Sequence, residues 1–301
     1  MRVLFTGSGW LPIVDMIAAR LPASATLVRW DQAIPLTDAI AEVDVLLPSN
    51  AKISADVIHA ARRLRLVQQP AAGTEQIDRA ALVERGIPLC NAPGTNHVSV
   101  AECALYLLLS LARRAPVAAQ KLRDRVIGEP LGIELAGRTL GVIGMGRAGT
   151  ALAERATALG MHVRALRRGA SDGDRVAFFA GCDAISIHCP LTPETRGLVD
   201  ARAFAAMRDG ALLINVARGG VIDRAALVAA LASGRLGGVG LDVHWSEPPD
   251  LDEDGLYRDA RVVALPHVAG STVEAFSRIA DVVVDNIARL DRGEPLRHRV
   301  A

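Results

Sequence analysis

Three glycines in a Gly-x-Gly-x-x-Gly spacing, Gly144, Gly146 and Gly149, constrain the fold of this chain more than any other feature. They follow the apolar run 139–143 and precede an alanine-rich segment, 150–159, that can form a helix. In such a strand–turn–helix unit the first glycine makes the tight turn, the second lets the backbone approach a pyrophosphate, and the third lets the helix pack close to the strand. The phosphates then lie at the positive end of the helix dipole. The pattern therefore predicts a dinucleotide-binding site.

Short apolar runs rich in Val, Ile and Leu alternate with longer helical patterns along almost the whole chain, which is typical of parallel α/β sheets. The first series of expected strands is Val3–Phe5, Thr26–Arg29, Val43–Leu47, Leu66–Gln69 and Pro88–Cys90. The second begins near Leu140 and continues with Met161–Leu166, Ala184–His188, Ala211–Asn215, Gly238–Asp242 and Val262–Ala264. A long helical pattern from 99 to about 125, interrupted by Pro116, separates the two series, and another runs from 272 to about 291. We therefore expect two doubly wound parallel-sheet domains, with the glycine fingerprint in the second.

The composition argues against several classes of partner. A formal net charge of +1 disfavours nucleic acid, which would need a concentrated basic face. The apolar run Cys103–Ala112 is too short to cross a bilayer, and the N-terminus lacks the pattern of a signal peptide, so we expect no membrane association. Four cysteines without a CxxC pair fit reduced thiols in a cytoplasmic protein. The seven histidines show no i, i+4 pairing, so no metal site is expected.

Two arginines bear on the choice of dinucleotide. An NAD site usually places an acidic residue about 20 positions after the fingerprint, where it binds the ribose 2′-OH. Here Arg167 and Arg168 stand at that spacing, and two guanidinium groups would attract a 2′-phosphate. We therefore favour NADP(H). The alternative is that the arginines form only a solvated strand end, and Asp172 and Asp174 leave NAD(H) open if their loop folds back.

Three polar residues follow later strands and suit carbonyl chemistry: Arg218, Glu247 and His267. Reduction of a 2-oxo acid needs a cation that holds the carboxylate and polarises the ketone, which Arg218 can supply in bidentate geometry. It also needs an acid for the developing alkoxide, and histidine has an ordinary pKa near working pH. A carboxylate such as Glu247 would fix the ring and favour its protonated form. Each of these residues taken singly is more often structural, but the set points to a dehydrogenase.

With these motifs the sequence resembles the D-isomer-specific 2-hydroxyacid dehydrogenase family over nearly its whole length. The matching stretches are Ala72-Gly-Thr-Glu-Gln-Ile-Asp78, Asn91-Ala-Pro-Gly-Thr-Asn96 with Ser99-Val-Ala-Glu102, Glu134-Leu-Ala-Gly-Arg-Thr-Leu-Gly-Val-Ile-Gly144, His188-Cys-Pro-Leu-Thr-Pro-Glu-Thr195, Asn215-Val-Ala-Arg-Gly-Gly220, Leu241-Asp242-Val243 and Pro266-His267-Val-Ala-Gly270.

The resemblance implies a catalytic set of Arg218, Glu247 and His267, with Ala72 and Gly73 binding the substrate carboxylate through backbone N–H groups beside Arg218 and His267. It implies cofactor contacts from the fingerprint and later strand ends, which here are Gly144, Met145, Gly146, Arg147, Ala148, Arg167, Arg168, Cys189, Pro190, Thr195, Ala217, Asp242 and Ala269. Asp242 is expected near the nicotinamide carboxamide. It further implies a flavodoxin-like substrate domain, residues 1–96 with 271–301, a Rossmann coenzyme domain, 97–270, and a homodimer built around the helix that begins near Ser99.

Departures from the family's patterns narrow the choice of reaction. Glu247 stands where formate-oxidising relatives carry glutamine, and no lysine stands at Ala72, as it does in phosphite-oxidising relatives. Arg167 replaces the usual acidic residue, as in NADPH-preferring glyoxylate and hydroxypyruvate reductases. We therefore expect reduction of a small 2-oxo acid of this type to the D-2-hydroxy acid. The alternatives are an NAD-linked D-2-hydroxyacid dehydrogenase, such as one acting on phosphoglycerate, and a nucleotide-sensing binding protein.

Four further residues have structural explanations to weigh against functional ones. Asp78 and Asp223 each precede a helical pattern, so we expect them to cap helices. His244 and Trp245 could shape a substrate pocket or pack in the core, and the sequence does not decide between these. The small residues of the loop 70–74 neither demand nor exclude a bulky substrate.

Overall fold

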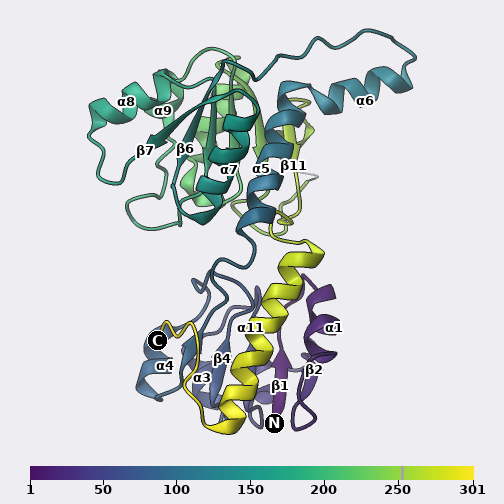
Figure 1. The fold of residues 1–301 in the computed structure, drawn as a ribbon, viewed down its shortest axis with the longest axis vertical. Helices are drawn as coiled ribbons and strands as arrows, with labels where there is room; N and C mark the ends of the chain where they lie inside the picture. The colour runs from purple at the N-terminus through teal and green to yellow at the C-terminus, as the bar shows by residue number, and fades with distance from the viewer. Residues whose placement is uncertain (252–253) are drawn as a thin grey trace. The chain divides into compact units, whose positions relative to one another are not determined.

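The computed structural model describes residues 1–251 and 254–301. The chain forms two compact units (Figure 1). Unit 1 consists of Met1–Asn96 together with Ser271–Ala301, and unit 2 of His97–Gly270.

Unit 1, all of whose residues are described, contains a five-stranded parallel sheet with the order β2-β1-β3-β4-β5. The strands are β1 (Arg2–Phe5), β2 (Thr26–Arg29), β3 (Val45–Leu47), β4 (Leu66–Gln68) and β5 (Leu89–Cys90). The helices are α1 (Pro12–Ala18), α2 (Leu36–Ala39), α3 (Ala55–Ala60), α4 (Arg79–Glu84) and α11 (Val273–Arg292). This strand order is that of flavodoxin-like folds, as expected. The expected strands are present, although β3 begins two residues later than predicted.

The two faces of this sheet bury separate apolar clusters because successive strand side chains point to opposite faces. Val3 and Phe5 pack on the side of α1 and α11, whereas Leu4 belongs to the cluster on the side of α3 and α4. The last residues of the chain then pair with the outer edge of β5, where the backbone N–H of Val300 donates to the oxygen of Leu89. This pairing covers an edge that would otherwise expose unpaired backbone groups.

A fully buried asparagine on α11 holds the segment that leads to this pairing. Asn286 accepts a hydrogen bond from the Arg297 N–H at 2.8 Å and donates to the Arg297 oxygen at 2.9 Å. Its Nδ2 also donates to Oε1 of Gln68, at the end of β4, at 2.6 Å. One amide group therefore connects the helix, the sheet and the C-terminal segment.

The described part of unit 2 contains a six-stranded parallel sheet with the order β11-β10-β9-β8-β6-β7. Its strands are β6 (Thr139–Ile143), β7 (His162–Leu166), β8 (Ala184–Ile187), β9 (Ala211–Asn215), β10 (Leu236–Leu241) and β11 (Val262–Ala264). In the usual Rossmann order a third strand lies outside the second. Here the described chain between β7 and β8 forms only a helix, so β7 is an edge strand. Its exposed His162 and Arg164 suit an edge that must not pair with other chains.

The described helices of this unit are α5 (His97–Ala112), α6 (Ala115–Arg123), α7 (Arg147–Ala158), α8 (Asp172–Ala180), α9 (Ala201–Ala206) and α10 (Arg224–Ala232), with the short 3-10 helices η1 (Gly219–Val221) and η2 (Gly255–Arg258). Helix α5 packs against α7 and against β9 and β10. A Cβ on Gly240 of β10 would lie 2.9 Å from Leu107 Cβ, so this glycine permits the close packing of α5. No described helix is both long enough and apolar enough to span a bilayer.

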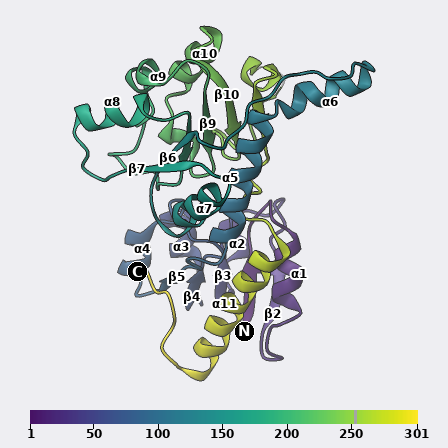
Figure 2. The same ribbon diagram turned by 45° about the horizontal axis from the view of Figure 1, so that its top comes forward.

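The long helical pattern expected between the two series of strands, with an interruption at Pro116, forms two helices, α5 and α6. The break falls at Arg114, whose φ of +52° is left-handed, and Pro116 lies in the first turn of α6. Proline is well tolerated there because the first N–H groups of a helix have no partner within it. Pro116 thus begins the second helix. In both views α6 projects away from the sheet of unit 2 (Figures 1 and 2).

We predict that Asn286→Ala lowers the free energy of unfolding of the protein by about 2–4 kcal/mol, because it leaves buried backbone groups of Arg297 without partners. Urea denaturation measures the change. The matched control is Asp281→Ala on the same helix, which removes an exposed ion pair with Arg20 at 3.4 Å and should cost less than about 1 kcal/mol. Equal losses in the two variants would contradict the role given to Asn286.

Candidate active site

The three fingerprint glycines have the local geometry that a dinucleotide requires. Gly144 follows β6 with φ +98°, and a Cβ there would lie 2.6 Å from the Cys189 nitrogen. A Cβ on Gly149 would lie 2.2 Å from the Gly144 oxygen, so that glycine permits α7 to pack against the turn. By contrast, no heavy atom of the described chain lies within 4 Å of a Cβ placed on Gly146. The position where backbone must approach the pyrophosphate is therefore open.

The N-terminus of α7 faces the same turn without a side-chain cap, since its N-cap residue is Gly146. Met145 and Arg147 are exposed and Ala148 is half-buried. Uncapped N–H groups at the positive end of a helix form a ready-made phosphate site. The residues present thus fit a dinucleotide, with its phosphates on the turn 144–148.

Exposed arginines follow β7, the strand beside β6. Arg167 and Arg168 form no salt bridge with any other described residue. The Thr192 hydroxyl is the largest cause of the lowered pKa of the Glu194 carboxyl, and the charge of Arg168 contributes to the same shift. The carboxylate of Asp174, which the sequence left as a possible ribose ligand, is engaged in a capping box with Ser171 at the start of α8.

The hydroxyl of Thr195 forms hydrogen bonds within the loop that follows β8. Thr195 Oγ1 donates to the Pro190 oxygen at 2.6 Å and accepts from the Thr192 N–H at 2.8 Å. Cys189 is buried against Gly144, whereas Pro190 is exposed. These residues therefore shape the loop beside the fingerprint, and Thr195 uses its hydroxyl within that loop.

Arg218 follows β9, in a turn that the last residue of the strand controls. The fully buried Asn215 accepts from the Ala217 N–H at 3.0 Å and donates to the Arg218 oxygen at 2.9 Å. The half-buried Arg218 guanidinium donates to the Ala217 oxygen at 2.7 Å. Sequence reasoning did not single out Asn215 as a site residue. The signal available was an asparagine directly before a turn, where its side chain can bond the backbone two residues on.

Glu247 and His267 form a close pair. Glu247 Oε2 lies 2.7 Å from His267 Nδ1, and the His244 N–H donates to Glu247 Oε1 at 3.2 Å. Burial alone would raise the pKa of Glu247, but the hydrogen bond and charge of His267 and the His244 N–H together lower it. The carboxylate therefore stays ionised beside the imidazole. The φ of His267 is +56°, so the residue is held in a left-handed conformation.

Asp242, fully buried at the end of β10, holds the backbone beside that histidine. Its two carboxylate oxygens accept from the Val268 N–H at 2.7 Å and the Ala269 N–H at 2.9 Å. Burial raises the pKa of the Asp242 carboxyl, and the two N–H donors oppose this shift. Both oxygens are thus engaged in positioning the His267 loop.

His244 and Trp245, whose roles the sequence left open, bond within the fold. A 2.8 Å hydrogen bond joins His244 Nδ1 to the Tyr257 hydroxyl, and His244 Nε2 lies 2.8 Å from the Leu265 oxygen. Trp245 Nε1 donates to the Ile222 oxygen at 2.9 Å. These contacts support the packing interpretation.

The expected helix caps are confirmed. Asp78 accepts from the Ala81 N–H at the start of α4, and Asp223 accepts from the Ala226 N–H at the start of α10. Both carboxylates therefore stabilise helix termini.

The remaining expected site residues, Ala72 and Gly73, belong to unit 1. They lie in the loop that follows β4, where Asn91 Nδ2 donates to the Ala72 oxygen at 2.8 Å. Ala72 is exposed and Gly73 is half-buried. The loop is thus tied to the segment after β5, at the carboxyl edge of the unit 1 sheet, where ligands of such sheets bind.

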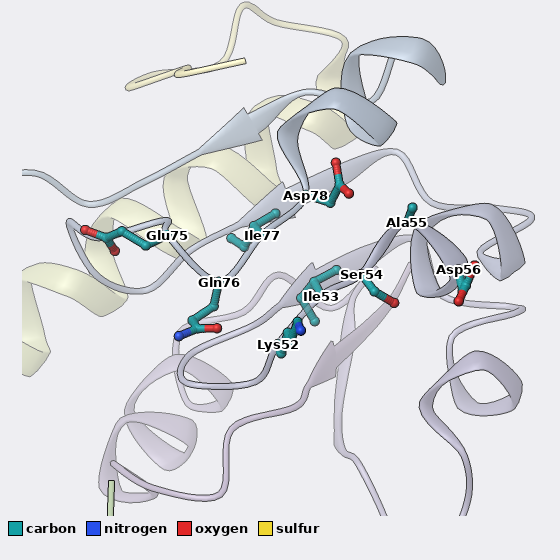
Figure 3. A pocket seen from close by; sticks show the side chains of 9 residues that line it. All are labelled: Lys52, Ile53, Ser54, Ala55, Asp56, Glu75, Gln76, Ile77 and Asp78. Atoms are coloured by element: carbon teal, nitrogen blue, oxygen red, sulfur yellow. The ribbon is translucent and has the colours of Figure 1, made fainter. Parts of the chain in front are cut away.

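A pocket of about 460 Å³ lies at the same edge of unit 1, between the loop after β3 and the segment before α4 (Figure 3). Its lining residues are Lys52, Ile53, Ser54, Ala55, Asp56, Glu75, Gln76, Ile77 and Asp78. Ser54 and Asp78 cap α3 and α4, and the backbones of Ile53 and Ile77 pair as a bridge. The lining therefore combines one cation with three carboxylates. Among the described residues no group of three or more histidines, cysteines or carboxylates could hold a metal ion.

Comparisons with known proteins agree with this architecture. A family model described as D-isomer specific 2-hydroxyacid dehydrogenase, NAD binding domain, matches residues 105–269. D-3-phosphoglycerate dehydrogenase of Archaeoglobus fulgidus is 38% identical over 85% of this chain and 51% of its own length. Hydroxypyruvate reductase of Thermotoga maritima is 38% identical over 84% of this chain and 86% of its own length. The crystal structure of the TT0316 protein from Thermus thermophilus has a TM-score of 0.90 and 33% identity over the full length of both chains.

This chain spans about half the length of the phosphoglycerate dehydrogenases that it matches. The family model alone covers more than half of the chain, from within α5 to the loop after β11. The match includes the fingerprint turn and the positions of Arg218, Glu247 and His267. The chain belongs to the D-isomer specific 2-hydroxyacid dehydrogenase family.

Proposed function

We propose that this protein reduces a small 2-oxo acid, of the glyoxylate or hydroxypyruvate type, to the D-2-hydroxy acid with a nicotinamide dinucleotide. The observation that carries the proposal is the 2.7 Å pair of Glu247 and His267, in the same compact unit as the fingerprint and the Arg218 turn. The turn 144–148 and α7 would hold the dinucleotide, which supplies the hydride when bound.

The side chains of this chain perform the rest of the reaction. Arg218 binds the substrate carboxylate and polarises the ketone. His267 gives its proton to the ketone oxygen as the hydride reaches the carbon, so the product is a neutral hydroxyl. Glu247 orients the imidazole through its 2.7 Å contact with Nδ1. Asp242 keeps the His267 loop in place through its bonds to the Val268 and Ala269 N–H groups, and it would lie near the nicotinamide carboxamide if the dinucleotide binds as proposed.

The cofactor that we propose is NADP(H). The guanidinium groups of Arg167 and Arg168 follow β7 without a salt bridge to any described residue, and the carboxylate of Asp174 is occupied by its capping box with Ser171. Asp172 is exposed in the first turn of α8, where its negative charge interacts favourably with the helix dipole. The charges near the adenosine ribose therefore suit a 2′-phosphate better than a 2′-hydroxyl.

A phosphorylated substrate is the second candidate, because relatives of this chain include D-3-phosphoglycerate dehydrogenases. A phosphate group needs cations or N–H donors in excess of carboxylates. Among the residues proposed here to bind the substrate, Arg218 is the only lysine or arginine, and the carboxylate of the substrate engages it. We therefore favour substrates without a phosphate. A nucleotide-sensing protein without catalysis is less consistent with the paired Glu247 and His267.

We further propose a homodimer in which the segment 115–133 contacts a second copy. Leu122, Ile127 and Leu131 on this segment are 79%, 97% and 85% exposed. Large apolar side chains this exposed, on a segment that projects from its domain, favour a protein–protein interface. We also propose that the protein is located in the cytoplasm, a reducing compartment in which its four free cysteines would stay as thiols.

Turnover tests the reaction directly. NADPH oxidation with glyoxylate, hydroxypyruvate and phosphohydroxypyruvate should show activity with the first two, and His267→Ala should lower kcat/KM by roughly 10²–10⁴-fold. The control is His298→Ala, which removes an exposed histidine that likewise has a positive φ, +54°, and should leave kcat/KM unchanged. Full activity of His267→Ala would exclude the proton-transfer role.

The arginine pair determines the cofactor in this proposal. Replacing both residues by alanine, Arg167→Ala with Arg168→Ala, should raise KM for NADPH by roughly tenfold or more, about 1.4 kcal/mol, and leave KM for NADH within about twofold. Steady-state kinetics with each cofactor measure this. Arg202→Ala, an exposed arginine on α9, is the control. Equal or better use of NADH by the unaltered protein would overturn the preference.

The dimer is tested by placing charge on the projecting segment. Ile127→Asp with Leu131→Asp should shift the protein from dimer to monomer in analytical ultracentrifugation, because burying two carboxylates in an apolar interface is costly. Val83→Asp, at a 66% exposed position of α4, should leave the mass unchanged. A monomeric parent protein, or a double variant that remains dimeric, would refute this interface.

A further inference from the structure

Asn215 uses both ends of its amide to fix the turn that carries Arg218. The side chain is fully buried at the last position of β9. Its Oδ1 accepts from the Ala217 N–H, two residues on, and its Nδ2 donates to the Arg218 oxygen, three residues on. These two bonds bracket the backbone from which the guanidinium projects. Arg218 is consequently extended, with φ −149° and ψ 138°.

The same residue joins the Arg218 turn to the loop that carries Glu247. The Asn215 backbone oxygen accepts from the Asp242 N–H at 3.0 Å, at the end of the neighbouring strand. Directly after Arg218, a Cβ on Gly219 would lie 2.2 Å from the His244 oxygen, so the turn packs tightly against that loop. The His244 N–H in turn donates to Glu247. A shift of the turn therefore moves Arg218 relative to the Glu247–His267 pair.

The chemistry of this position demands an amide. An aspartate of the same shape would keep the bond from the Ala217 N–H but would place a second acceptor against the Arg218 oxygen. An alanine would leave both backbone groups buried without these partners, and such groups are costly. Only a side chain with one acceptor and one donor at this length satisfies the turn.

We propose that Asn215 is a positioning residue that sets the direction in which Arg218 meets the substrate carboxylate and ketone. This inference rests on the role proposed for Arg218 in the reduction of 2-oxo acids. Misplacing a binding group by about 1 Å can cost on the order of 10²-fold in rate. The effect of losing the amide donor should therefore fall on substrate binding and turnover, because that donor bonds the Arg218 oxygen. An aspartate keeps the bond from the N–H of Ala217, an expected cofactor contact, so dinucleotide binding should change little.

The discriminating variant is Asn215→Asp, because its defect depends on pH. Burial raises the pKa of a carboxyl group, and the protonated form regains the donor that the Arg218 oxygen needs. At pH 8 we expect kcat/KM about 10²-fold below the parent protein, with the NADPH Kd within about twofold. Between pH 8 and pH 5 the ratio of variant to parent kcat/KM should rise by at least about fivefold. A flat ratio, or an equal loss of NADPH affinity, would overturn the positioning role.

A second test asks whether the effect passes through Arg218. On an Arg218→Lys background, where the bidentate fork is already lost, Asn215→Asp should lower kcat/KM less than about threefold, because effects on one functional unit are not additive. The matched control is Asn286→Asp. Asn286 is equally buried and brackets Arg297 with the same two kinds of bond, but it lies in unit 1. That control should reduce thermal stability and show no pH-dependent recovery of kcat/KM. Undiminished loss on the Arg218→Lys background would contradict the inference.

Binding of oxalate, a carboxylate mimic of a 2-oxo acid, to the protein with NADP⁺ separates this inference from the proposed reaction. Calorimetry should give an oxalate Kd at least about tenfold weaker for Asn215→Asp at pH 8. If the parent protein reduced no 2-oxo acid yet the variant lost oxalate affinity in this way, the proposed reaction would fail and the positioning role would stand. If the parent protein were active and the variant matched it in turnover and oxalate affinity, the positioning role would fail alone.

Discussion

Hydrogen bonds from backbone N–H groups to two buried side chains, Asp242 and Asn215, are the interactions on which the arrangement of the candidate active site depends. Asp242 holds the N–H groups of Val268 and Ala269, and Asn215 holds that of Ala217. Burying a carboxylate or an amide is costly unless its polar atoms are paired. Because each of these groups is satisfied only when the loop lies in one position, the cost of burial enforces that position. The loops are thereby ordered before any substrate binds.

The parallel sheet explains why residues far apart in the sequence form one set. Arg218, Glu247 and His267 follow β9, β10 and β11, which are neighbours in the sheet. Parallel strands end at the same edge, so residues placed after consecutive strands meet there without any long-range signal in the sequence. The order of apolar runs and the polar residues after them were enough to select the three. The 2.7 Å contact between Glu247 and His267 agrees with that selection.

The sequence indicates where the site residues lie along the chain, but it does not indicate the contacts that set their geometry. Gly-x-Gly-x-x-Gly and the alternation of strands and helices depend on local rules, and they predicted both sheets. The break before α6 depends on the left-handed Arg114, a conformation that no residue pattern indicated. The expected strands, by contrast, already included none between 166 and 184, and the described chain has none there. In the sequence, Asn215 could be recognised only as the last residue of an expected strand. Its two hydrogen-bond partners, the Ala217 N–H and the Arg218 oxygen, depend on the turn that the side chain closes.

In the proposed complex, the fingerprint and the arginine pair would contact different parts of the dinucleotide by different means. The turn 144–148 would bind pyrophosphate with backbone N–H groups, which every sequence provides once glycines allow the approach. The ribose would be read by side chains after β7, an edge strand whose terminal loop carries Arg167 and Arg168 in solvent. A change of side chain there leaves the turn, the sheet and the Asp242 and Asn215 bonds intact. If the arginine pair sets the cofactor preference, that preference could change without altering the loops that hold Arg218 and His267.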